Sequence, residues 1–266
     1  MNGLIEGYLG VSAEGKKSKL PAKLDYWQSA TGLFLGLFMW GHMLFVSTIL
    51  ISKDFMYMIT KIFEGSFIFG DEGKPIIVGI LAFFIFFIFI VHAMLALRKF
   101  PSNYQQYKIL KTHTIALKHD DTKLWFIQAF TGFAMFFLGS VHLYIIMSSP
   151  EKIGPYASAD RIVSDFMWPL YILLLLAVEF HGSIGLYRLA VKWGWFDGKD
   201  ARQTRIKLKK AKWAATIFFL LLGFASLAAY IKIGIEHKDN YGERYKPESH
   251  VSYIMKKNTQ TKGILS

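Results

Sequence analysis

Residues 75–97 read PIIVGILAFFIFFIFIVHAMLAL, a run that contains no Lys, Arg, Asp or Glu and a single histidine, His92. About 20 apolar residues in a helix are enough to span the hydrocarbon core of a bilayer. Four more apolar runs follow this pattern, although Glu179 interrupts one of them: Ser29–Ile51, Leu124–Pro150, Phe166–Tyr187 and Trp213–Ile231. The sequence therefore predicts an all-α integral membrane bundle of five transmembrane helices.

Composition and charge agree with a membrane protein. Only 19% of the 266 residues are charged, against about 25% in soluble domains. The net charge of +12 could suggest nucleic acid, but the Lys and Arg residues gather in alternate connections. Four precede the first span, six lie between the second and third, and nine between the fourth and fifth, against three and two in the other short loops. By the positive-inside rule the N-terminus is cytoplasmic and the C-terminus periplasmic.

Three segments follow from the five runs. Residues 1–28 are predicted to be a cytoplasmic leader without an apolar signal-peptide core, 29–235 a five-helix membrane domain, and 236–266 a polar, irregular tail. An amphipathic stretch, Phe55–Glu64, is expected along the outer membrane surface. The basic loops 98–123 and 188–212 either set the topology and attract lipid headgroups or dock a soluble partner. The chain has no cysteine, so any iron–sulfur cluster must belong to another subunit.

Four histidines lie inside the apolar runs, in two matching frames. Trp27–Gly32 (WQSATG) is followed ten residues after its glycine by His42, and Ile127–Gly132 (IQAFTG) is followed at the same distance by His142. His92 and His181 share a second frame, since HAMLALR resembles HGSIGLYR in its small and apolar positions. The first two spans and the next two therefore form a weak repeat.

The depths of these histidines give the same pairing. At 1.5 Å per residue, His42 and His142 lie roughly 20 Å from the cytoplasmic face, and His92 and His181 roughly 10 Å from it. Neutral imidazole is an axial ligand of haem iron, so two levels of paired imidazoles predict two non-covalent bis-histidine b haems. A single buried histidine is as often an interhelical hydrogen bond or a proton relay. Zinc is disfavoured because no acid or cysteine lies near the outer pair.

Polar residues at the span ends are candidates for the haem propionates, which need partners at the membrane boundary. Anchoring at the interface explains them equally well. The inner haem would use Gln28, Ser29, Trp125 and Lys192, and the outer haem would use Arg161.

Two acids and four further histidines need separate interpretation. Glu179 is the only acid within a span, and such a group usually faces protein or a water-filled cavity, so we expect a proton-transfer role. Glu64 by itself indicates a solvated surface acid. The remaining histidines are expected to be solvated in polar segments: His113, His119, His237 and His250.

Long runs of the chain resemble the dihaem cytochrome b subunit of the succinate:quinone oxidoreductase family, specifically the five-helix anchor of bacterial menaquinol:fumarate reductase. The resemblance covers residues 16–235. It is close in four runs: Pro21–Asp25, Gln28–Leu37, Thr131–Tyr144 and Leu186–Gly198.

This resemblance implies roles that spacing alone does not give. His92 and His181 would bind the proximal haem, and His42 and His142 the distal haem. Glu64 matches a position associated with menaquinol oxidation, and Glu179 matches the acid of a transmembrane proton route. The implied partners are an iron–sulfur subunit and a flavoprotein with FAD that reduces fumarate, assembled as a dimer of heterotrimers in the bacterial cytoplasmic membrane.

Three alternatives stay open at this point. The same subunit can serve a succinate dehydrogenase, because sequence does not fix the direction of electron flow. A dihaem anchor of a hydrogenase or formate dehydrogenase would keep the haems and change the soluble partner. A haem-free transporter that uses buried histidines is disfavoured, because no span is broken in the way that transporter sites require.

Overall fold

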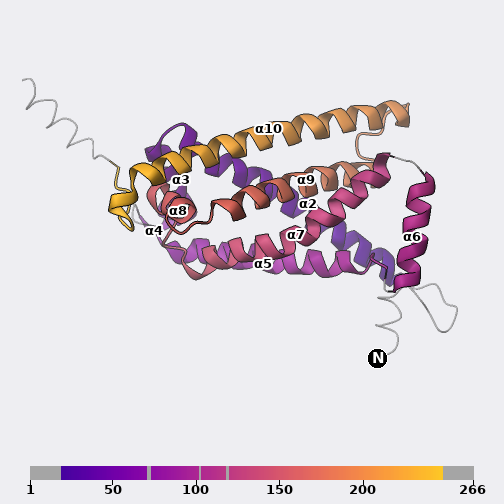
Figure 1. The fold of residues 1–266 in the computed structure, drawn as a ribbon, viewed down its shortest axis with the longest axis horizontal. Coiled ribbons are helices and arrows are strands. Elements are labelled where there is room, and N and C mark those ends of the chain that lie inside the picture. The colour runs from indigo at the N-terminus through magenta and orange to yellow at the C-terminus, as the bar shows by residue number, and fades with distance from the viewer. Residues whose placement is uncertain (1–18, 71–72, 102, 118–119, 248–266) are drawn as a thin grey trace, which may run out of the picture.

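A computed structural model of the chain describes residues 19–70, 73–101, 103–117 and 120–247 (Figure 1). Among these residues, five helices are long and apolar enough to cross a membrane, which confirms the predicted all-α membrane bundle. They are α2 with the 3-10 turn η1 (Leu20–Val46, Ser47–Leu50), α5 (Pro75–Leu97), α7 (Asp120–Ser148), α9 (Trp168–Lys192) and α10 (Ala201–Glu236).

Shorter helices lie at both ends of the bundle (Figure 1). At one end are α3 (Lys53–Phe63), α4 (Ser66–Phe69), α8 (Pro155–Val163) and the turn η2 (Lys238–Asn240); at the other end α6 (Tyr104–Leu117) lies across the bundle. We call the end with α6 the inner end, because its loops carry the basic residues, and the opposite end the outer end. The predicted amphipathic stretch is therefore a helix, α3, at the outer end.

Helix starts follow ordinary local chemistry. Proline occupies one of the first two positions of α2, α5, α8 and α9, where its missing N–H costs no hydrogen bond. The side chain of Asp200 accepts from the backbone N–H groups of Arg202 and Gln203 and caps α10. Capping at this residue starts α10 well before the apolar run, so the basic residues 207–212 lie on a helix and not in a loop.

The structure also changes the boundaries predicted for the leader and the tail. Helix α2 begins at Leu20, so the last third of the predicted leader is helical, while residues 1–18 lie outside the described part. Residues 236–247 of the predicted tail are described and are held against the outer end, as shown below. Residues 248–266, which include His250, lie outside the described part.

The bundle is organised around α9, which packs against α7, α10 and α2, while α5 packs against α2 and α7. Large apolar side chains stay exposed along the outside of the spans, among them Phe83, Phe87, Phe130, Phe137 and Leu221. In a bilayer this apolar surface faces lipid tails, so close approach of helices depends on small residues and buried polar groups. The four histidine-bearing helices are α2, α5, α7 and α9.

Candidate functional site

The structure brings together the histidines that the repeat and the depths had paired. The ring centroids of His42 and His142 are 6.1 Å apart, and those of His92 and His181 are 6.4 Å apart. Each pair joins helices that are not neighbours in the chain, α2 with α7 and α5 with α9. No group of three or more His, Asp or Glu side chains able to hold a metal ion occurs among the described residues.

These separations match two imidazoles that share one metal ion. A metal–nitrogen bond to histidine is about 2.0 Å long, and a ring nitrogen lies about 1.1 Å from the imidazole centroid, given bonds of about 1.33 Å. Two histidines that face each other across one iron therefore have centroids roughly 6 Å apart. A direct hydrogen bond between the rings would place the centroids closer, and both observed separations are compatible with one iron held by each pair.

The inner pair, His92 and His181, is held in one tautomer. The hydroxyl of Thr31 donates to the carbonyl of Trp27 (2.8 Å) and lies 3.0 Å from Nδ1 of His92. Nδ1 of His181 lies 2.8 Å from the carbonyl oxygen of Gln128, which can only accept. The carbonyl partner fixes the proton of His181 on Nδ1. The same tautomer at His92 lets the Thr31 hydroxyl accept from Nδ1–H while it donates to Trp27, and each Nε2 then keeps a free lone pair. This is the arrangement in which a second hydrogen bond orients a metal-binding histidine.

The two glycines of the repeat, Gly32 and Gly132, have the same packing role in each copy. A Cβ atom on Gly32 would lie 2.9 Å from Cε1 of His92, and a Cβ on Gly132 would lie 2.9 Å from Cε1 of His181. In each copy the Thr-Gly step of one helix thus makes space for the imidazole of another helix. The sequence showed these glycines as markers of the repeat, but their role at the inner pair was missed.

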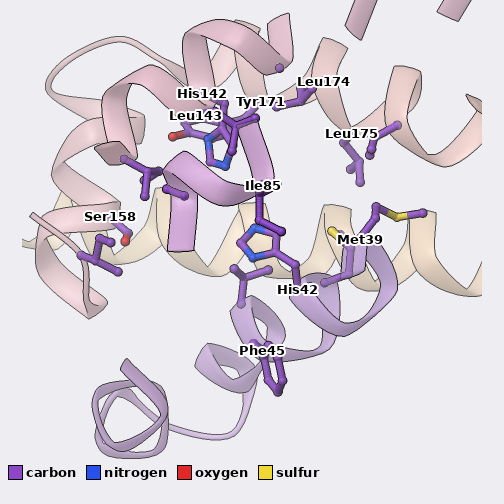
Figure 2. A pocket seen from close by; sticks show the side chains of 18 of the residues that line it. Met39, His42, Phe45, Ile85, His142, Leu143, Ser158, Tyr171, Leu174 and Leu175 are labelled. Atoms are coloured by element: carbon purple, nitrogen blue, oxygen red, sulfur yellow. The ribbon is translucent and has the colours of Figure 1, made fainter. Parts of the chain in front are cut away.

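The outer pair, His42 and His142, lies in a large apolar cavity. Figure 2 shows both rings entering one pocket, with Tyr171 beside His142. The cavity has a volume of about 390 Å³, and its lining comes from α2, α3, α5, α7, α8, α9 and α10. The ring of His42 stacks on Phe38, while Nδ1 of His142 is buried without a partner in the described part of the chain. The lining suits a large apolar group.

At the inner end, three of the predicted propionate contacts lie on α2 and α9. The ammonium group of Lys192 donates to the hydroxyl of Ser29 (2.9 Å) and binds the carboxylate of Asp25. The side-chain oxygen of Gln28 is buried and finds no partner among the described residues. The structure therefore brings Ser29 and Lys192 into contact and adds Asp25, which the sequence had not singled out.

The other two predicted contacts lie on different elements. Trp125, near the start of α7, packs against Phe100 in the connection that follows α5. Arg161 of α8 is buried at the outer end, lines the cavity with His142, and donates to the backbone carbonyl of Lys152. Arg161 is thus placed beside the outer pair, on the side where the sequence expected it.

Glu64 is not the solvated surface acid that its position alone indicated. Its side chain is only 4% exposed, and Lys61 donates to it over 2.7 Å. The turn after α3 packs against it: the N–H of Lys74 donates to the Glu64 carbonyl (2.7 Å), and a Cβ atom on Gly73 would lie 3.0 Å from Oε2 of Glu64. Glu64 directly follows Phe63, which lines the cavity, while Glu64 itself is not among the lining residues.

Glu179 is fully buried within α9, with 0% of its surface exposed. Neither carboxyl oxygen has a hydrogen-bond partner among the described residues. One turn away, Ser183 accepts a hydrogen bond from Thr216 of α10 (2.7 Å). The acid therefore faces the interior of the bundle, as expected for an ionisable group within a span.

His237 was predicted to be solvated, and this was wrong. It is 5% exposed, its Nδ1 lies 2.9 Å from a carboxylate oxygen of Asp160, and its ring stacks on Tyr156. The N–H of Gly242 donates to the same carboxylate (3.0 Å). The start of the predicted tail is therefore ordered, because α8 supplies a buried acid that the end of α10 must satisfy. The side chains of His113 and His119 lie outside the described part.

A second hydrogen bond holds the same segment at the outer end. Tyr241 donates to Asp165 over 2.9 Å. This hydrogen bond, with the negative charge of the acid, raises the pKa of the Tyr241 phenol. The contact stays intact at neutral pH, since the phenol remains protonated.

Comparison with known proteins assigns the family. Residues 103–223 match the succinate dehydrogenase/fumarate reductase transmembrane subunit family. The fumarate reductase cytochrome b subunit of Wolinella succinogenes is 61% identical over 236 residues, which are 89% of this chain and 92% of that protein. The chain belongs to the fumarate reductase cytochrome b subunits.

Further relatives of this cytochrome b family agree. The subunit of the same name from Helicobacter pylori strain J99 is 56% identical over 237 residues, 89% of this chain and 91% of that protein. A succinate dehydrogenase hydrophobic membrane anchor subunit from Archaeoglobus fulgidus is 36% identical over 63 residues, 23% of this chain and 54% of that protein. The family expected from the quoted runs is confirmed.

Proposed function

We propose that the chain is the membrane anchor and electron-transfer subunit of a menaquinol:fumarate reductase and binds two b haems. The observation that carries this proposal is the presence of two facing histidine pairs, at two levels of one bundle and at the separation that a shared iron requires. Names of the relatives support it, since they are cytochrome b subunits of fumarate reductase.

The residues fit two haems. His92 and His181 would hold the inner haem, and His42 and His142 the outer haem. Partners for the propionates would be Gln28, Ser29, Trp125 and Lys192 at the inner end and Arg161 at the outer end. When bound, such haems supply one-electron transfer, while the protein fixes the orientation of each imidazole and excludes water with apolar walls.

Quinol chemistry is assigned to the outer end. Glu64 is a buried acid next in sequence to Phe63, which lines the outer cavity, and Lys61 holds its carboxylate in one position. It would accept a proton as menaquinol is oxidised there. Glu179, buried between the two levels, would carry protons along the bundle. Both assignments rest on the family resemblance and on the burial of the two acids.

The complex and its orientation follow from the same proposal. An iron–sulfur subunit would dock on the inner end, where α6 and the basic start of α10 lie, and a flavoprotein with FAD would reduce fumarate. The complex would be a dimer of heterotrimers, with the N-terminus of this chain in the cytoplasm and its C-terminus in the periplasm. Service in a succinate dehydrogenase is the second candidate, favoured by the anchor subunit that matches part of the chain.

An optical spectrum tests the haem proposal. The purified, dithionite-reduced protein should show b-type bands and two haems per chain. A preparation without haem absorbance would rule out the proposal, and a single haem would remove one histidine pair from it.

A substitution that removes the charge of Glu64 and keeps its size tests the quinol site. Glu64→Gln should abolish menaquinol oxidation and leave both haems and fumarate reduction by an artificial donor intact. Glu236→Gln is the matched control, because it removes an exposed acid at the same end. Equal loss in both variants would argue against Glu64, and full quinol-driven turnover in Glu179→Gln would exclude the proton route.

A further inference from the structure

Each copy of the repeat has a glutamine and an arginine at its inner end, but the two side chains are hydrogen-bonded to each other in only one copy. In the second copy, Arg188 donates to the side-chain oxygen of Gln128 over 2.9 Å, so the two side chains satisfy each other. The corresponding residues in the first copy are Gln28 and Arg98. There the side-chain oxygen of Gln28 and Nε of Arg98 are both buried and find no partner among the described residues.

Buried polar atoms are nearly always hydrogen-bonded in native structures. The first copy therefore keeps hydrogen-bonding capacity at its inner end that the second copy uses up internally. Arg98 is also only 10% exposed, and its guanidinium donates to the carbonyl of Pro21 (3.3 Å). A cation that is this buried needs a negative partner close by.

The carboxylate of Asp25 lies among three cations at the inner end. Asp25 binds the ammonium groups of Lys99 and Lys192, and the guanidinium of Arg98 lies 4.0 Å from it. These cations come from the inner ends of α5 and α9, which carry His92 and His181. Asp25 therefore ties together the ends of the two helices that present the inner histidine pair.

The charges do not cancel in the protein alone. Among the described residues, three cations contact the Asp25 carboxylate, so this cluster carries two more positive charges than negative ones. Two haem propionates carry the same amount of negative charge. The surplus positive charge and the buried, unpaired Nε–H donor of Arg98 suit a dianionic group at this place.

We propose that Asp25 is a positioning residue for the inner haem: it holds Arg98, Lys99 and Lys192 as a preformed site for the two carboxylates, and its own negative charge lowers the potential of that haem. This inference rests on the proposed function. The inner site would be assembled before the haem carboxylates arrive, because the carboxylate of Asp25 already orders the long cationic side chains.

Electrostatics fixes the sign of the effect. Oxidised haem carries one more positive charge than reduced haem, so a nearby carboxylate stabilises the oxidised form and a nearby cation destabilises it. Removal of the Asp25 charge should therefore raise the inner potential, and removal of the Lys99 charge should lower it. A purely structural role would move both in the same direction or move neither.

The test is a redox titration of the purified, haem-loaded complex that resolves two one-electron components. The inner component is the one lost in His92→Ala. Asp25→Asn should raise the reduced-to-oxidised ratio of this component by up to about tenfold at fixed potential, ~59 mV for one electron. Asp25→Glu should restore the wild-type value, and the outer component should not move.

Two lysine variants complete the design. Lys99→Gln should shift the inner component downwards, whereas Lys23→Gln, the matched control, removes an exposed charge two residues from Asp25 and should leave it in place. If Asp25→Asn does not assemble, the contrast between the two lysine variants decides. The inference would be overturned if the potential of the inner component did not shift, or shifted in the same direction, in Asp25→Asn and Lys99→Gln. Wild-type protein that lacked two haem components would instead overturn the proposed function.

Discussion

The inner and outer histidine pairs have almost the same ring separation, yet the protein holds them by different means. The inner rings are fixed by hydrogen bonds at Nδ1 and by two glycines that make space for them. The outer rings stand in an apolar cavity against Phe38 and Tyr171, and Nδ1 of His142 is buried without a partner among the described residues. One site is built from specific polar contacts, and the other mainly from shape.

This difference fits the position of each pair. The inner pair lies within a tightly packed repeat, where small residues let helices approach. The outer pair shares its cavity with α3 and α8, short helices that a quinol site at the outer end would need. A cavity with an apolar wall accommodates an isoprenoid substrate more readily than a closely packed repeat does.

Removal of a ligand gives the largest effect and tests the comparison directly. His92→Ala should lose the inner haem alone and His42→Ala the outer haem alone, so each preparation keeps about half of the wild-type haem. Haem content and a redox titration with one missing component are the measurements. If both substitutions removed the same component, the pairing of the four histidines would be wrong.

Replacement of a repeat glycine should act on the inner site only. In Gly132→Ala the new methyl group would lie 2.9 Å from the His181 ring, and such overpacking costs roughly 1–3 kcal/mol. Affinity for the inner haem should then fall about tenfold or more. Gly41→Ala is the control, since its methyl group would meet only Phe45 at 3.9 Å. Haem retention through purification measures both, and equal loss would contradict a selective role for Gly132.

The spans and the histidine pairs could be predicted from sequence because each depends on a local or periodic property. An uncharged run such as residues 75–97 becomes α5 without any change of boundary. The depth of each histidine in the membrane follows from the helical rise. The pairs predicted from depth, His42 with His142 and His92 with His181, lie close together in the structure. Glycine identity in the repeat was visible as well, although its contact with a histidine of another helix was not.

The burial of ionisable groups outside the spans could not be predicted in the same way. Glu64, Asp160 and His237 stand in polar segments, where the local pattern indicates exposure. They are buried because short helices at the outer end fold over them, and that depends on contacts between segments distant in sequence. Helix ends shifted for a related reason, since capping by Asp200 extends α10 beyond its apolar run.

A smaller effect is expected when the hydrogen bond between His237 and Asp160, next to Arg161 of the outer site, is removed. His237 holds Asp160, which precedes Arg161, so His237→Ala leaves a buried carboxylate with one partner fewer. Such a loss costs about 1–3 kcal/mol and should lower Tm by roughly 5 °C in a chain of this size. The outer haem potential should change and the inner one should not. Tyr241→Phe, which removes an exposed hydrogen bond to Asp165, is the control in the same thermal melts and titrations.

The smallest effect concerns the hydroxyl that holds the inner ring. Thr31 accepts the Nδ1 proton of His92, and such a contact increases the basicity of a metal-binding imidazole. Thr31→Val keeps the shape and removes this acceptor, so the oxidised inner haem loses stability and its potential should rise by less than about tenfold in the reduced-to-oxidised ratio. Thr31→Ser keeps the acceptor and should behave like wild type. A redox titration that showed the same shift in the serine variant, or a shift of the outer component, would mean that packing and not the hydrogen bond distinguishes the inner pair.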